Sequence, residues 1–140
     1  MAQRTRIVII GAGFGGLQAA QSLSGANAEV LLIDRHIHHT FIPLLYQVAT
    51  AQAEPTQIIY PIRTLLRRSP NVRFLMSEVH RVDFQTQTVE TDHSLISYDY
   101  LVLATGSQTQ FYGVAGAAQY ALPLRSIDEA IAIRNHIITR

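Results

Sequence analysis

The sequence has 140 residues, contains no cysteine, and all eleven of its basic residues are arginine. Without a thiol the chain forms no disulfide, offers no thiolate nucleophile and cannot ligate zinc or an iron–sulfur cluster through cysteine. Without lysine it has neither a Schiff-base amine nor the lysine of a P-loop nucleotide site. The absence of cysteine excludes disulfide exchange by these 140 residues, and the absence of lysine excludes a P-loop nucleotide site.

Long apolar runs and an excess of charge are also missing. No run approaches the roughly 18 apolar residues of a membrane-spanning helix, and the N-terminus has no signal-peptide pattern, so we expect the chain to fold in the cytoplasm. The formal net charge is +1, which gives no reason to expect a nucleic acid as partner. With 48% hydrophobic residues, the chain can bury the core of one compact domain.

Strands and helices alternate in the first part of the chain. Residues 6–10, RIVII, are apolar without alternation after Arg6, which is typical of a strand buried on both faces of a parallel sheet, and residues 28–33, AEVLLI, predict a second buried strand. A helix that ends at Gly25 is expected between them. Further along, apolar runs predict strands at 71–76 and 100–104, and short alternating segments predict a meander over residues 79–82, 88–90 and 94–98.

Other elements are indicated by capping residues. The segments after Pro43 and Pro61 predict short helices, and the polar stretch 34–41 is interpreted as a loop. Ser126 is a candidate N-cap for a helix over 127–138. The predicted fold class is α/β: a Rossmann-like parallel sheet with a small antiparallel β-meander, forming part of an FAD/NAD(P)-binding domain.

The turn after the first strand has the pattern G-x-G-x-x-G at Gly11, Gly13 and Gly16. In this pattern the first glycine permits a tight turn, the second lets a pyrophosphate approach the backbone, and the third lets the helix pack close to the strand. The amides that open the helix, around Phe14 and Gly15, can donate hydrogen bonds to phosphate oxygens at the positive end of the helix dipole.

Asp34 follows at the carboxyl end of the second strand. A carboxylate there can accept hydrogen bonds from both hydroxyls of a ribose, and it would repel a 2′-phosphate. The turn and the acid together predict a site for an adenine dinucleotide. The alternative is a glycine-rich turn beside an ordinary surface acid.

NAD and FAD share the ADP moiety, so the turn alone does not distinguish them. A plain NAD-binding unit would continue with another α/β repeat, whereas here a meander follows the third strand. The strand in YDYLVLATG then ends on Ala104, Thr105 and Gly106. This order resembles the FAD domain of the flavoproteins that bind two dinucleotides, in which the equivalent triplet closes over the flavin.

Residues 34–51, DRHIHHTFIPLLYQVATA, resemble the type II NADH dehydrogenases, the single-subunit NADH:quinone oxidoreductases of the pyridine nucleotide-disulfide oxidoreductase-like superfamily. The likeness continues through YDYLVLATGS and LPLRSIDEAIAIRNHI, and it corresponds to the N-terminal part of a family member. Disulfide reductases of this superfamily carry a cysteine pair after the second strand, which this sequence lacks.

The resemblance implies contacts with FAD. The glycine turn would hold the pyrophosphate and Asp34 the adenosine ribose, with Arg35 beside the adenine. The backbone of residues 43–45 would lie against the isoalloxazine, and Val79 would meet the adenine edge through its main chain. The predicted cofactor-binding residues are Gly11, Gly13, Phe14, Gly15, Gly16, Asp34, Arg35, Pro43, Leu44, Leu45, Val79, Ala104, Thr105 and Gly106.

The implied reaction is hydride transfer from NADH to the flavin, followed by electron transfer to a quinone, with no catalytic side chain nominated in this segment. Gln47 is a candidate for the quinone pocket, while Ile42 stands where the family often has glutamine. NADH and quinone are the implied partners, at the cytoplasmic face of the membrane. We expect residues 1–113 to be the N-terminal portion of the FAD-binding domain, and residues 114–140 a linker and helix leading to an absent NADH-binding domain, so that this segment alone is inactive.

Two other readings stay open. A non-catalytic adenine-dinucleotide-binding module, or another FAD-dependent pyridine nucleotide oxidoreductase, would carry the same turn. His36, His38 and His39 are close enough to suggest a metal site, but no acid accompanies them apart from Asp34, so no metal is expected.

The last predicted helix has an apolar face formed by Ile127, Ile131 and Ile138. We expect this face to lack its natural partner. An exposed apolar stripe favours self-association, so a homodimer of the segment is a further expectation.

Overall fold

The structure is a computed structural model that describes residues 4–139. It divides the chain into two compact units, the first made of residues 1–39 and 61–106 and the second of residues 40–60 and 107–140. Each unit is therefore built from two separate stretches of sequence.

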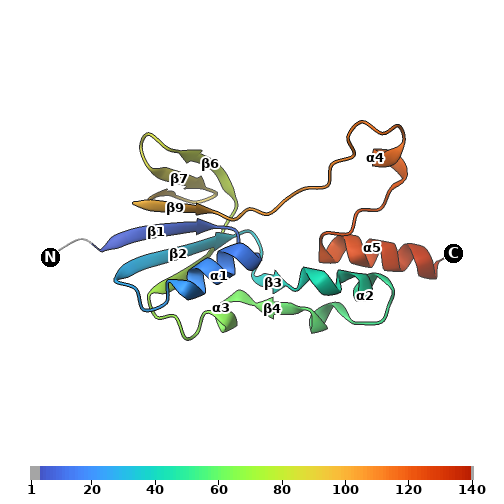
Figure 1. The fold of residues 1–140 in the computed structure, drawn as a ribbon, viewed down its shortest axis with the longest axis horizontal. Coiled ribbons are helices and arrows are strands. Elements are labelled where there is room, and N and C mark those ends of the chain that lie inside the picture. The colour runs from blue at the N-terminus through green and yellow to red at the C-terminus, as the bar shows by residue number, and fades with distance from the viewer. Residues whose placement is uncertain (1–3, 140) are drawn as a thin grey trace. The chain divides into compact units, whose positions relative to one another are not determined.

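A parallel sheet of four strands forms the centre of the first unit (Figure 1). The first strand along the chain pairs over its whole length with the second, from Thr5 opposite Ala28 to Ile10 opposite Ile33. Strands covered on both faces need apolar residues at every position, which explains the unbroken apolar runs in the sequence. The strands in spatial order are β5 (Val72–Met76), β2 (Ala28–Asp34), β1 (Thr5–Ile10) and β9 (Tyr100–Leu103). The predicted parallel sheet is confirmed.

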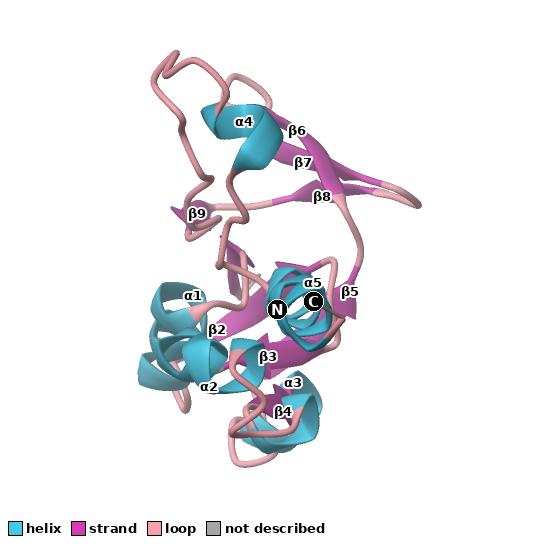
Figure 2. Cartoon of the chain, turned by 90° about the vertical axis from the view of Figure 1, so that its right-hand side faces the viewer, coloured by secondary structure: helices cyan, strands magenta, loops and turns pink. Residues whose placement is uncertain are grey.

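Helices cover one face of this sheet and the meander covers the other (Figure 2). Side chains alternate between the faces of a strand, so Ile9 packs with Leu17 of the first helix, whereas its neighbour Val8 packs with Val89 and Tyr98 of the meander region. The predicted antiparallel meander is confirmed. The covering elements are α1 (Phe14–Ser22), α3 (Ile62–Leu65), β6 (Val79–Asp83), β7 (Thr88–Thr91) and β8 (Leu95–Ser97).

The second unit has its own core between two helices. Leu45 and Val48 of α2 (Leu45–Ala49) pack with Ile58 and with Ala130 of α5 (Ile127–Ile138), and all four side chains are buried. Helices far apart in sequence thus share one apolar cluster. The helical elements of this unit are η1 (Ile42–Leu44), α2 (Leu45–Ala49), η2 (Pro55–Gln57), α4 (Ala117–Tyr120) and α5 (Ile127–Ile138).

Two very short strands lie where the chain passes between the units. β3 (His38–Thr40) and β4 (Ile59–Pro61) form a two-stranded sheet. The expectation of a loop throughout 34–41 is therefore wrong at its end, because a strand of three residues gains its hydrogen bonds from a distant partner and leaves no pattern of its own.

The last helix begins where the sequence predicts. Ser126 is its N-cap: the Ser126 hydroxyl accepts a hydrogen bond from the Glu129 N–H at 3.2 Å, and the Glu129 carboxylate accepts one from the Ser126 N–H at 3.1 Å. The unpartnered face expected on this helix is only partly present. Ile127 and Ile131 pack against the α2 cluster, whereas Ile138 is 63% exposed. Among the described residues, no helix is both long and apolar enough to span a bilayer.

Candidate functional site

The glycine turn, Asp34 and the triplet 104–106 lie at the carboxyl ends of the parallel strands in the first unit. Main-chain hydrogen bonds tie these ends together: the Gly11 N–H donates to the Ile33 carbonyl at 2.8 Å, the Ala104 N–H to the Ile10 carbonyl at 2.8 Å, and the Ser77 N–H to the Asp34 carbonyl at 3.0 Å. In open α/β sheets this edge is where ligands bind.

The three glycines of the turn differ in what the fold demands of them. Gly11 has a φ of +100°, and a Cβ there would lie 2.2 Å from the Ala104 carbonyl oxygen. A Cβ on Gly16 would lie 1.7 Å from the Gly11 carbonyl oxygen. Gly13 has a φ of −68°, and a Cβ there would meet no atom within 4 Å. The fold therefore requires glycine at 11 and 16 and has no need of it at 13.

The start of α1 is open to solvent and carries no competing anion. Gly13 is the N-cap and makes no side-chain capping bond, and the first turn contains no acidic residue. Gly13, Phe14 and Gly15 are exposed. The positive end of a helix dipole at an exposed turn suits an anionic group, and an alanine at 13 would place its methyl in the open space beside that turn.

Asp34 is oriented by the main chain around it. One carboxylate oxygen accepts the Ala12 N–H at 2.7 Å, and the other accepts the His36 N–H at 2.8 Å. The His36 ring is 3.4 Å from the second oxygen, and the Asp34 side chain is 18% exposed. A carboxylate has about four acceptor positions, so it keeps capacity for ribose hydroxyls. The ribose contact of Asp34 stays a prediction.

Of the three histidines His36, His38 and His39, only His39 is buried. The sequence alone does not distinguish it from the other two. Its Nδ1 atom is 2.9 Å from the Ala12 carbonyl oxygen, and its ring meets Phe14 edge to face with centroids 4.9 Å apart. Within residues 4–139 no group of His, Asp or Glu is arranged to hold a metal ion.

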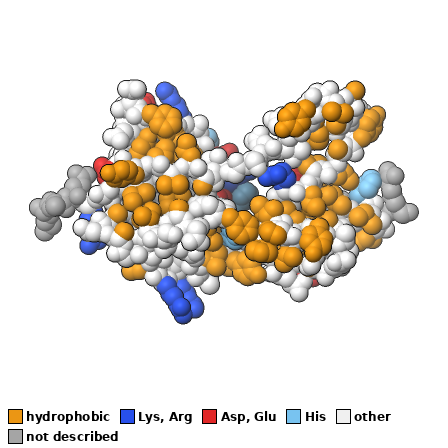
Figure 3. All heavy atoms as spheres, viewed as in Figure 1, with side chains coloured by type: hydrophobic (Ala, Val, Ile, Leu, Met, Phe, Trp, Pro, Cys, Tyr) orange, Lys and Arg blue, Asp and Glu red, His pale blue; other side chains and the backbone are white. Residues whose placement is uncertain are grey.

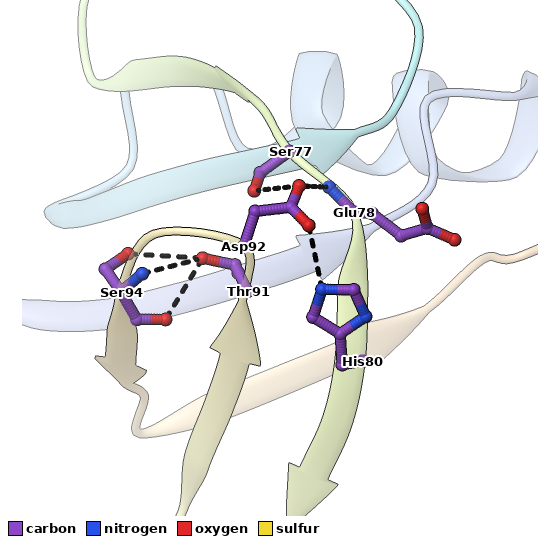
Figure 4. A network of polar contacts seen from close by, with 6 residues as sticks. All are labelled: Ser77, Glu78, His80, Thr91, Asp92 and Ser94. Carbon is purple, nitrogen blue, oxygen red and sulfur yellow. Dashed lines mark hydrogen bonds and ion pairs between the residues drawn. The ribbon is translucent and has the colours of Figure 1, made fainter.

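Asp92 holds the connection between β5 and β6, next to the predicted adenine contact (Figure 4). Its carboxylate accepts hydrogen bonds from the Glu78 N–H at 2.8 Å, the Ser77 hydroxyl at 3.1 Å and the His80 ring at 2.8 Å. These bonds, first of all the one from the Glu78 N–H, lower the pKa of Asp92. No sequence motif indicates this residue, because its partners lie 12 to 15 positions away along the chain, in the connection after β5 and on β6.

The other predicted contact residues divide between the two units. Arg35, Thr105 and Gly106 are exposed and Val79 is half-buried in the first unit. Residues 43–45 belong to the second unit. Leu45 there is 1% exposed, and its side chain packs in the apolar cluster of that unit. The roles of all these residues stay predictions.

The fold and the glycine turn define a Rossmann-type, dinucleotide-binding α/β protein. The family model described as pyridine nucleotide-disulphide oxidoreductase matches residues 5–139, and the chain belongs to this family. Because the sequence has no cysteine, residues 1–140 supply no disulfide for such chemistry.

Curated relatives carry a more specific description. The chain is 41% identical over 139 residues to the type II NADH:quinone oxidoreductase NdhA of Mycobacterium tuberculosis, covering 96% of this chain and 30% of that protein. It is 31% identical over 142 residues to the type II NADH:quinone oxidoreductase of Staphylococcus haemolyticus, covering 98% of this chain and 35% of that protein. The predicted resemblance is confirmed, and the chain spans about a third of the length of these relatives.

Solved structures show the same fold. The sulfide:quinone oxidoreductase of Aquifex aeolicus superposes with a TM-score of 0.87 at 26% identity, covering 96% of this chain and 32% of that chain. NDH2 of Plasmodium falciparum, solved in complex with NADH, superposes with a TM-score of 0.84 at 27% identity, covering 94% of this chain and 28% of that chain.

Proposed function

We propose that this chain is the FAD-binding portion of a membrane-associated NADH:quinone oxidoreductase. The observation that carries the proposal is Gly13: the fold has no need of glycine there, and a Cβ would enter only open space at the exposed start of a helix. A pyrophosphate seated against the backbone accounts for that glycine. The type II relatives support the reaction class.

Four groups of residues in this chain would hold FAD. The turn at 11–16 would bind the pyrophosphate, and Asp34 with Arg35 would bind the adenosine. Val79 and the triplet 104–106 would contact the adenine edge and the flavin, and the main chain of 43–45 would face the isoalloxazine. When bound, FAD would supply the passage of electrons from NADH to quinone.

The first experiment is a titration of the full chain with FAD, followed by flavin fluorescence and calorimetry. Gly13→Ala should weaken FAD binding by about tenfold or more, equivalent to about 1.4 kcal/mol, because the added methyl displaces the pyrophosphate. It should cost no more than about 1 kcal/mol of folding free energy. Gln18→Ala, on the exposed side of the same helix, is the matched control and should bind as the wild type does.

Titration with NAD and ADP distinguishes a flavin-binding portion of an enzyme from a non-catalytic module that binds adenine dinucleotides. A flavin-binding portion should bind FAD more tightly than NAD, because only FAD adds flavin contacts to the shared ADP moiety. Equal or tighter binding of NAD would favour the module, and an absence of saturable FAD binding would contradict the proposal.

A further inference from the structure

Both main-chain groups of Ala12, inside the glycine turn, are held by side chains. Asp34 accepts the Ala12 N–H at 2.7 Å, and His39 lies 2.9 Å from the Ala12 carbonyl oxygen. Ala12 is 3% exposed and His39 is 6% exposed, so water does not replace either partner readily. The acid comes from the end of β2 and the imidazole from β3.

The protonation of the His39 ring follows from its partner. A carbonyl oxygen only accepts hydrogen bonds, so the Nδ1 atom that faces it must carry a proton. An aromatic contact fixes the ring as well: Phe14 meets His39 with an interplanar angle of 89°. The ring is therefore held as a donor toward residue 12.

The direction of the Ala12 carbonyl determines the direction of the next amide. A peptide unit is planar, and in the trans form its C=O and N–H point in opposite directions; the described chain has no cis peptide bond. The Ala12 carbonyl turned toward His39 therefore turns the Gly13 N–H away from it. Gly13 is the exposed N-cap of α1, where the proposed pyrophosphate would bind.

We propose that His39 is a positioning residue: its Nδ1–H bond to the Ala12 carbonyl, opposite the Asp34 bond, presets the Gly13 amide for a diphosphate ligand. This inference rests on the proposed function for its ligand. It assigns no contact between His39 and the ligand itself. The peptide would be oriented before binding, so the ligand would not have to pay for ordering it.

Two substitutions test separately the two contributions of the His39 side chain, its N–H donor and its aromatic ring. His39→Phe keeps an aromatic ring beside Phe14 but leaves the Ala12 carbonyl without its donor. His39→Asn loses the ring but keeps an N–H donor on Cγ, at the place of Nδ1. His38→Phe, at the exposed neighbour on the same strand, is the matched control.

Binding of FAD and of ADP to each variant is measured by calorimetry, and the Gly13 amide is followed by NMR. We expect His39→Phe to weaken both ligands by about tenfold and to shift the Gly13 amide resonance. His39→Asn should restore most of the affinity, and His38→Phe should bind as the wild type does. Equal weakening by Phe and Asn, or none by Phe, would overturn the role of the donor.

The nitrogen resonances of the His39 ring give a test that needs neither ligand nor variant. In the wild-type chain Nδ1 should be protonated, and an unprotonated Nδ1 would overturn the inference even if His39→Phe fails to fold. A wild-type chain with protonated Nδ1 that binds neither FAD nor ADP would instead contradict the proposed function, and with it the ligand role of His39.

Discussion

The first unit buries its apolar residues on both faces of a parallel sheet, whereas the second joins two helices over a single small cluster. Large apolar side chains are exposed in both units, but the two most exposed among the described residues lie in the second: Tyr112 is 90% exposed and Tyr120 is 77% exposed. Figure 3 shows apolar side chains gathered over the segment that carries α4. The comparison indicates that most of the folding free energy belongs to the first unit, which also carries the glycine turn.

The largest effect is expected where the turn and the sheet of the first unit meet. Gly16→Ala would put a methyl carbon 1.7 Å from the Gly11 carbonyl oxygen, a main-chain atom that cannot move without displacing β1. We expect a loss of more than about 4 kcal/mol, which leaves the first unit unfolded. Circular dichroism and denaturant unfolding measure this loss.

Gly13→Ala is the control for the same turn, because its methyl meets no atom within 4 Å. The two variants should therefore differ: Gly16→Ala loses the fold, whereas Gly13→Ala keeps the fold and binds FAD about tenfold or more weakly than the wild type does. A Gly16→Ala chain as stable as Gly13→Ala would show that the turn does not fix the packing of α1 on β1.

Core truncations test whether the two units unfold separately. Ile9 and Leu45 are both buried, one in each unit. Ile9→Ala and Leu45→Ala should each cost about 2–5 kcal/mol. Hydrogen exchange should show lost protection in the parallel strands for Ile9→Ala and in α2 and α5 for Leu45→Ala.

Leu95→Ala, which removes a side chain that is 68% exposed, is the control and should change little. A uniform loss of protection over the whole chain in both core variants would contradict separate unfolding. In that case the two units would form one cooperative body despite their separate clusters.

Features of the first unit follow from the sequence because each depends on neighbouring residues. An unbroken apolar run predicts a buried parallel strand, and the glycine spacing predicts the turn that follows β1. The cap at Ser126, in the second unit, is predicted for the same reason, since its partner Glu129 is three residues away. The sequence also predicts Asp34 at the carboxyl edge of the sheet, because it directly follows the second apolar run.

The remaining features depend on contacts that are distant in sequence. The burial of Ile127 and Ile131 depends on α2, which the helix sequence itself does not reveal. Among the histidines after Asp34, only the fold shows that His39 is the buried one and that it faces Ala12. Asp92 likewise gains its partners through the pairing of the meander strands.

The smallest effect is expected from pH and concerns two acids of the meander. Hydrogen bonds from main-chain N–H groups lower the pKa of Asp92, chiefly through Glu78, and of Asp83, chiefly through Thr86. A carboxyl whose pKa is lowered by folding stabilises the fold above its unfolded pKa of about 3.9. That contribution is lost as the pH falls from there through the folded value.

Asp92→Asn and Asp83→Asn should therefore both lower stability at neutral pH and flatten its decline in acid, as measured by thermal unfolding from neutral to acidic pH. Their effects on ligand binding should differ. Asp92 holds Ser77, whose N–H is bonded to the Asp34 carbonyl. Asp83 instead accepts hydrogen bonds from the turn after β6 and pairs with Arg81 on that strand. Asp92→Asn should weaken FAD binding at neutral pH, and Asp83→Asn should not. Equal FAD affinities of the two variants would show that the hydrogen bonds of Asp92 do not support the adenine contact.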